Sequence, residues 1–88
     1  MKKDKIFTTV KLPVSDLEAV VLEGTGKNLF NALTISKGDQ GLFSKQLIIE
    51  LVRIDDKGIN SEEVDEMHMR DVSYLQEVIS LMTKNGID

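Results

Sequence analysis

The chain has 88 residues, of which 41% are hydrophobic, and this length suits one small domain with a modest core. It contains no cysteine, which excludes disulfides and thiolate metal sites. No apolar run approaches the roughly 20 residues of a membrane span, and no signal-peptide stretch follows the basic start. We therefore expect a single cytoplasmic domain, covering residues 1–88, with no membrane partner.

The charge is unevenly distributed along the chain. The net charge is −4, with eight Lys/Arg against six Asp/Glu in residues 1–54 and three against nine in residues 55–88. A nucleic-acid binder gathers basic groups on one surface, so we expect no nucleic-acid partner. The acidic half either keeps the domain in solution or attracts a basic protein.

Two extended segments open the chain. Alternation from Lys5 to Leu12 predicts a strand with Ile6, Thr8, Val10 and Leu12 on one face. Proline cannot donate to a strand ladder, so Pro13 ends it, and a second extended run covers Leu17 to Glu23. The two segments predict an antiparallel hairpin over about residues 5–23.

The remainder, about residues 26–85, is predicted to be helical. Thr25 is a plausible N-cap for a helix with Leu29, Phe30, Ala32 and Leu33 at helical spacing, and Gly38 follows its end. We interpret residues 39–41 as a turn. A second helix, over residues 42–54, carries a broad apolar stripe and is expected to be the central one; the stripe comprises Phe43, Leu47, Ile48, Leu51 and Ile54.

Shorter signals complete the predicted fold. Residues 55–58 (DDKG) indicate a turn, Ser61 is placed to cap a helical turn that includes Val64, and residues 67–69 suit a loop. Asp71 is expected to be the N-cap of the last helix, and Gly86 its C′ residue. Val72, Leu75, Val78, Ile79 and Met82 are expected to face inward. The fold class is α+β: an N-terminal antiparallel β-hairpin followed by three to four α-helices.

No motif carries a catalytic chemistry. Residues 24–27 (GTGK) lack the spacing of a phosphate loop, and residues 53–64 lack the oxygen ligands of an EF-hand at the required positions. His68 is the only histidine, and one histidine among carboxylates is a weak metal or acid–base signal. We therefore expect no enzyme and assign no catalytic, cofactor-binding or metal-binding residue.

Met67 and Met69 are the more useful clue. Methionine suits adaptable surfaces that bind partner helices, although it fills protein cores more often. If these two side chains are exposed, they form a soft apolar patch beside carboxylates, able to hold an amphipathic segment with basic flanks.

The order of these features resembles Mu-like phage tail assembly chaperones. The opening KIFTTVKLPV is similar to the first strand of that family, which ends in Leu-Pro-Val, and Gly26-Lys27-Asn28-Leu29 is similar to its Gly-x-x-Leu helix start. The apolar helix, the Glu-Glu turn and the element before the last helix match residues 46–52, 62–64 and 67–71 in order.

The resemblance implies a non-enzymatic role in a tailed phage or prophage. Such chaperones are thought to coat the helical tape measure protein while tail tube subunits polymerise around it, so the tape measure protein is the expected partner and the tube protein a further one. A shielding surface needs exposed apolar residues, and Phe43, Met67 and Met69 are our candidates for partner binding. A homo-oligomer is compatible with the same apolar stripes.

Three alternatives stay open. The first is a structural protein that remains in a phage particle or mobile element. The second is a small acidic regulatory adaptor whose Glu62, Glu63, Asp65 and Glu66 attract a basic protein in a salt-dependent way. The third, a metal-dependent enzyme, predicts metal binding that is lost in His68→Ala.

Overall fold

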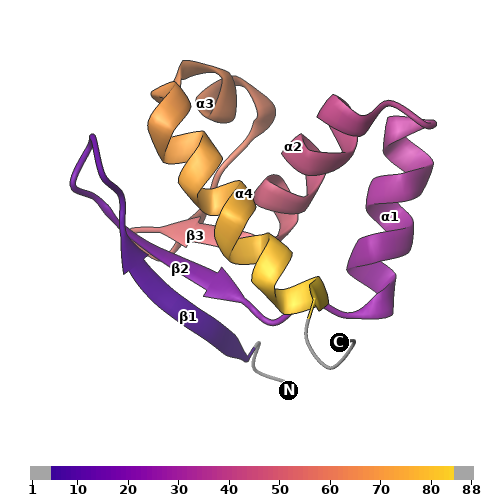
Figure 1. The fold of residues 1–88 in the computed structure, drawn as a ribbon, viewed down its shortest axis with the longest axis horizontal. Coiled ribbons are helices and arrows are strands. Elements are labelled where there is room, and N and C mark those ends of the chain that lie inside the picture. The colour runs from indigo at the N-terminus through magenta and orange to yellow at the C-terminus, as the bar shows by residue number, and fades with distance from the viewer. Residues whose placement is uncertain (1–4, 85–88) are drawn as a thin grey trace.

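The computed structural model describes residues 5–84, without the side chains of residues 83 and 84. The hairpin of β1 (Ile6–Lys11) and β2 (Glu18–Leu22) leads into two helices, α1 (Gly26–Ser36) and α2 (Gln40–Leu51). A second, small hairpin follows, and then two more helices; these elements are β3 (Val52–Ile54), β4 (Lys57–Gly58), α3 (Ser61–Glu66) and α4 (Met69–Lys84). The predicted α+β fold, a hairpin followed by helices, is therefore confirmed, with four helices (Figure 1).

The four strands form one antiparallel sheet in the order β1-β2-β3-β4. The predicted hairpin is confirmed, but its first strand is not regular, because the register shifts between Ile6 and Thr8. A bulge inserts one extra residue and reverses which side chains face the core. Phe7 consequently packs against the core, and Ile6, which alternation placed on the inner face, is 58% exposed.

The helix predicted over residues 42–54 is wrong at both ends. Asp39 is the N-cap, since its carboxylate accepts a hydrogen bond from the Leu42 amide at 3.0 Å, so residues 39–41 begin the helix and are not a free turn. After Leu51 the backbone becomes extended, and Val52 pairs with Val21 of β2. The open edge of β2 offers a full ladder of hydrogen bonds to a β-branched segment, and this outweighs continuation of the apolar helical stripe.

The turn predicted at residues 55–58 is confirmed as the loop of the β3–β4 hairpin. Asp55 and Asp56 both have positive φ, 56° and 63°, and Ile54 pairs with Lys57 across them. Two central residues with positive φ define the type I′ turn, whose twist matches that of the paired strands.

The helix caps agree with the sequence in one case and differ in two. Thr25 is the N-cap of α1, as predicted. Asn60, and not Ser61, caps α3 through a reciprocal pair of hydrogen bonds with Glu63, of 2.8 and 2.9 Å. Asp71 is not a cap, because α4 already begins at Met69; its carboxylate is buried. Gly86 lies outside the described residues.

One core joins the sheet to α2 and α4. The inward positions predicted for α4 are confirmed, with Leu75, Val78 and Ile79 buried against Ile48 and Leu51 of α2 and against β2. α4 crosses the sheet, whereas α1 lies beside α2 and away from the sheet (Figure 1). No helix in the described part of the chain is both long and apolar enough to cross a membrane.

Candidate docking groove

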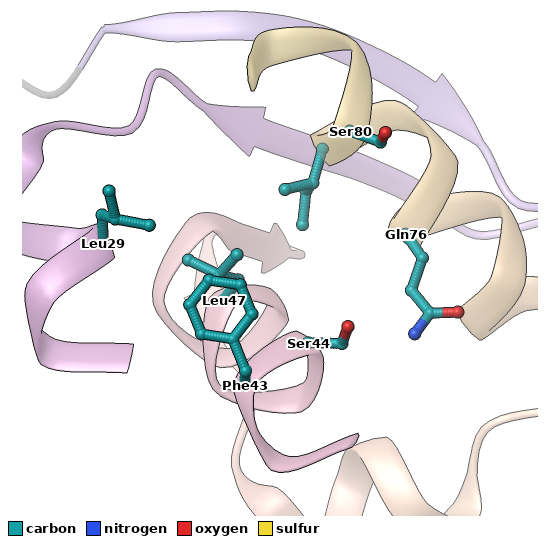
Figure 2. Close-up of a pocket in the computed structure, with 7 residues that line it drawn as sticks. Leu29, Phe43, Ser44, Leu47, Gln76 and Ser80 are labelled. Carbon is teal, nitrogen blue, oxygen red and sulfur yellow. The ribbon is translucent and has the colours of Figure 1, made fainter. Parts of the chain in front are cut away.

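A groove runs between α1 and α4 with α2 as its floor. Leu29 of α1 and Phe43 and Leu47 of α2 point into the same space, and Gln76 and Ser80 of α4 lie on the far side (Figure 2). Ser44 and Ile79 complete the lining. We call these seven residues the central groove; two helices form its walls and a third forms its floor.

The groove continues past the amino end of α1. A second hollow shares Leu29, Leu47 and Ile79 with the central groove and extends it to the segment 24–26, Asn28, Leu51 and Met82. No residue that lines either hollow is charged, although Asp, Glu, Lys and Arg make up 30% of the chain. A surface without charge desolvates at low cost, which is what an apolar partner requires.

Hydrogen bonds hold α1 in place as one wall. The Asn28 side-chain amide donates to one Glu50 oxygen at 2.8 Å, and the Gln46 amide donates to the other at 3.1 Å. The Asn28 oxygen in turn accepts from the Thr25 backbone amide at 2.9 Å. Because Glu50 and Gln46 belong to α2, these hydrogen bonds fix the first turn of α1 against the floor of the groove.

The apolar stripe predicted for α1 is formed, but most of it is exposed. Only Ala32 and Ser36 are buried in this helix. Leu29, Phe30 and Leu33 are 39%, 65% and 46% exposed, and of these three only Leu29 lines the groove. Helical spacing predicts which residues share a face, but it does not say whether the protein itself covers that face.

The three predicted partner-binding residues lie in two adjoining hollows. Phe43 lines the central groove. Met67 and Met69 line a neighbouring hollow, which includes Val64 and Val72 and shares Gln76 with the groove. Met67 is partly buried against the core, whereas Met69 is 82% exposed. Their role in partner binding stays a prediction.

Sequence reasoning did not select the walls of the groove. The sequence predicted only that Leu29 shares a helical spacing with its neighbours and that Ile79 faces inward. Ile79 is buried as predicted, and both residues also line the hollow. The sequence did carry one signal for this wall. α1 has a single charged residue, Lys27, among its 11 residues, and so little charge is typical of a helix that contacts apolar surface on more than one side. Nothing in the sequence indicates that α4 packs far enough from α1 to leave a groove between the two helices.

Two of the motifs considered for chemistry, segment 24–26 and His68, form hydrogen bonds. Segment 24–26 ends the extension of the groove, where the Gly24 amide donates to the Met82 sulfur at 3.1 Å. His68 is exposed, and its Nδ1 accepts from the Arg70 amide at 3.1 Å at the start of α4. Within residues 5–84, no three His, Asp or Glu side chains cluster as a metal site would require.

Asp71 is the one buried carboxylate among the described residues. Its two oxygens accept from the backbone amides of Val14 at 2.8 Å and Ser15 at 3.1 Å, so it ties the β1–β2 turn to the first turn of α4. Burial alone raises the pKa of this group, but the hydrogen bonds from Val14 and Ser15 and the nearby His68 hold it below its usual value. Asp71 is thus a structural anion.

Comparison of the chain with known protein families, with curated proteins and with solved structures found no match.

Proposed function

We propose that this protein is a non-enzymatic tail assembly chaperone of a phage or prophage, which binds helical segments of the tape measure protein in its central groove. The observation that carries the proposal is an open groove with an uncharged lining, to which α1 contributes the exposed Leu29. The order of sequence features typical of Mu-like tail chaperones supports the same function.

The shape of the groove favours a helix as its occupant. Two helical walls and a helical floor form a hollow that accepts the side chains of a fourth helix lying across it, and these would pack between Leu29, Leu47 and Ile79 as in a helical bundle. Recognition of this kind places apolar residues of the guest at positions i, i+3, i+4 and i+7. The hollow beside Met67 and Met69 would lengthen the contact toward α3.

A weak and repeated contact suits the task. A tape measure protein exposes apolar helical surface until the tail tube encloses it, and apolar surface left in water drives aggregation. A groove with a few large side chains holds such a helix without a large buried interface, so bound copies can leave when tube subunits arrive. Several copies along one tape measure protein are expected, in the host cytoplasm where tails assemble.

The test is co-expression with the tape measure protein of the phage or prophage that carries this gene. We expect the protein to increase the soluble fraction of the tape measure protein and to co-purify with it. Leu29→Asp puts a carboxylate into the groove and should abolish both effects, because a buried unpaired charge is costly. Solubility of the tape measure protein that is equal with and without its proposed chaperone contradicts the proposal.

Ile35→Asp is the matched control. Ile35 lies on the same helix and is 52% exposed, but it lines no part of the groove. A carboxylate near the carboxyl end of α1 disturbs the helix dipole more than one in the first turn, so the control is the harsher test of folding. Solubilisation should survive in Ile35→Asp. Equal loss in both variants, with both shown to be folded by circular dichroism, would contradict the groove as the binding site.

The alternative functions predict different results for purified phage particles and for binding assays with this protein. A structural protein would stay in purified particles at fixed stoichiometry, whereas a chaperone would be absent from them. An acidic adaptor would bind a basic protein through Glu62, Glu63, Asp65 and Glu66 of α3, all exposed. The affinity of such binding would fall steeply with increasing salt concentration and would not change in Leu29→Asp.

A further inference from the structure

We propose that this protein has a second docking surface, an apolar hollow bordered by carboxylates, which binds a protein segment with one large apolar side chain flanked by arginine or lysine. The surface lies where the β1–β2 turn, the β3–β4 hairpin and α3 meet, at the end of the molecule away from α1 (Figure 1). The inference goes beyond the proposed function and does not depend on it, because this surface shares no residue with the central groove or its extension.

Two adjoining hollows form this surface. One extends from the β1–β2 turn to the start of α4, and the other extends from the same turn to the β3–β4 hairpin. Leu17, Ile54, Glu63 and Met67 line both hollows, Glu66 lines only the first and Asp55 only the second; we call these six residues the acidic hollow.

The acidic hollow has an apolar part that the fold leaves partly open. Leu17 is 44% exposed, and Val14, which lines the first hollow, is 43% exposed. Ile54 and Met67 are half-buried, since each packs against the core with only part of its surface. An apolar side chain of a partner placed among these residues would bury surface that is otherwise in contact with water.

Contacts within the protein hold both sides of the hollow in place. The Asp71 carboxylate accepts from the backbone amides of Val14 and Ser15 at 2.8 and 3.1 Å, which fixes the β1–β2 turn. On the other side, the reciprocal hydrogen bonds between Asn60 and Glu63 fix the first turn of α3. A preformed surface loses little conformational entropy when it binds, so it can recognise a short segment.

Carboxylates dominate the charge of this surface. The charged or titratable residues that line the two hollows are Asp55, Glu63, Glu66 and Asp71, against Lys57 and His68. Asp71 has both oxygens occupied by backbone amides. The carboxylates of Glu66 and Asp55 accept no hydrogen bond and form no ion pair within the described residues 5–84. They are therefore available to a cation of a partner.

The charge selects the kind of partner. A purely apolar segment would leave the carboxylates of Glu63 and Glu66 desolvated and unpaired, which is costly. The same carboxylates repel nucleic acid, an anionic membrane surface and a second copy of this chain, whose net charge is −4. Glu63 and Glu66 are three positions apart on α3 and share a face of the helix, where one arginine or two lysines can pair with both. A basic flank next to an apolar side chain thus satisfies both parts of the hollow.

This recognition differs from a general attraction of basic proteins by α3. Glu62 and Asp65 are also exposed on α3, but neither lines the acidic hollow. A general attraction would use all four acidic residues of the helix and would need no apolar side chain. Binding in the hollow requires Glu66 and an apolar anchor together.

The experiment is an NMR titration of the full isotope-labelled chain with short synthetic peptides. The probe is acetyl-Gly-Arg-Leu-Arg-Gly-amide, and two matched peptides replace its leucine with alanine or both arginines with glutamate. We expect the probe to shift the amide signals of Leu17, Glu63 and Met67 with a Kd of about 1 mM, which suits a contact of a few side chains. The alanine peptide should bind at least about threefold more weakly, the glutamate peptide should not bind, and higher salt should weaken binding of the probe.

Glu66→Gln is the test variant and Glu62→Gln its matched control. Both remove one charge from an exposed position of α3, so they change the net charge equally. Glu66→Gln should weaken binding of the probe about twofold to fivefold, as for one exposed ion pair, whereas Glu62→Gln should leave it within about 1.5-fold. Equal effects of the two variants, equal affinity for the leucine and alanine peptides, or no shift at about 10 mM probe would each overturn the inference. Probe-induced shifts at Leu29 and Gln76 in place of Leu17 would overturn it as well, and would leave the proposed function standing.

Discussion

Replacement of Asp71 by asparagine tests the contact that joins the two ends of the fold. Asp71 accepts two backbone hydrogen bonds, from Val14 and Ser15, residues more than 50 positions away in the chain. In Asp71→Asn the side chain keeps its shape but has one accepting oxygen, so its own NH₂ group faces the second backbone donor. That donor, at a part-buried position, is left without its carboxylate partner.

The magnitude follows from this count. One unsatisfied buried donor costs about 1–3 kcal/mol, and the remaining hydrogen bond loses its charge assistance. We expect a loss of about 2 kcal/mol in the free energy of unfolding at pH 7. For a domain of this size each kcal/mol lowers Tm by about 4–8 °C, so the expected fall is about 10 °C. Thermal unfolding followed by circular dichroism measures it.

The pH dependence gives an independent check. The pKa of Asp71 in the folded protein is lowered from its ordinary value of 3.8. A carboxyl with a depressed folded pKa contributes stability that is fully present above the unfolded value and is lost as pH falls through the folded value. The difference in Tm between wild type and Asp71→Asn should therefore be largest near neutral pH and shrink below about pH 4.

The control is Asp16→Asn in the turn next to the same anchor. The Asp16 side chain is 78% exposed and forms only a long ion pair with Lys11, of 3.9 Å. Its φ is 70°, a conformation that asparagine also tolerates, so this change should alter stability by less than about 0.5 kcal/mol. Wild-type stability in Asp71→Asn at pH 7, or a difference that stays constant down to pH 3, would refute the role assigned to this carboxylate.

Three further substitutions test the fold by chemical denaturation. Asp56→Gly should stabilise the protein by up to about 1 kcal/mol, because Asp56 has a φ of 63° in a type I′ turn that favours glycine at this position; a loss of stability would contradict the turn type. Ile48→Ala should cost about 2–5 kcal/mol, since Ile48 is 1% exposed at the centre of the core, and a loss below 1 kcal/mol would place it elsewhere. Asp65→Asn removes the ion pair with Lys45, 2.7 Å long, but should cost less than about 1 kcal/mol because the Asp65 side chain is 63% exposed; the cost should shrink further in high salt.

The two surfaces of this protein differ in what they offer a partner. The groove between α1 and α4 is lined without charge, whereas the hollows near α3 are charged: one includes Asp65 with its ion-pair partner Lys45, and another includes Glu63 and Glu66. An apolar helix with a basic flank could meet both, with its apolar stripe in the groove and its cations toward α3. The predicted site at Met67 and Met69 lies where these two environments meet.

Local signals in the sequence were sufficient for most of the secondary structure. Alternation predicted the first hairpin and Pro13 the end of its first strand, Thr25 capped α1 as expected, and the stripe from Val72 to Met82 faces the core. Each of these depends on neighbours within a few positions, such as a side chain that caps the next turn or residues that share one helix face. Information of that range is present in the order of residues alone.

Tertiary structure decided the features that depend on distant partners. Val52 became a strand because the edge of β2 lay beside it, and Asp71 left its expected place as a cap because the amides of Val14 and Ser15 were within reach. The exposure of Leu29 was decided in the same way: helical spacing defines an apolar face, but only the placement of α4 relative to α1 leaves a groove open beside it. The sequence determines which local conformation and environment a side chain favours, and the tertiary structure determines which distant groups lie close enough to bind it.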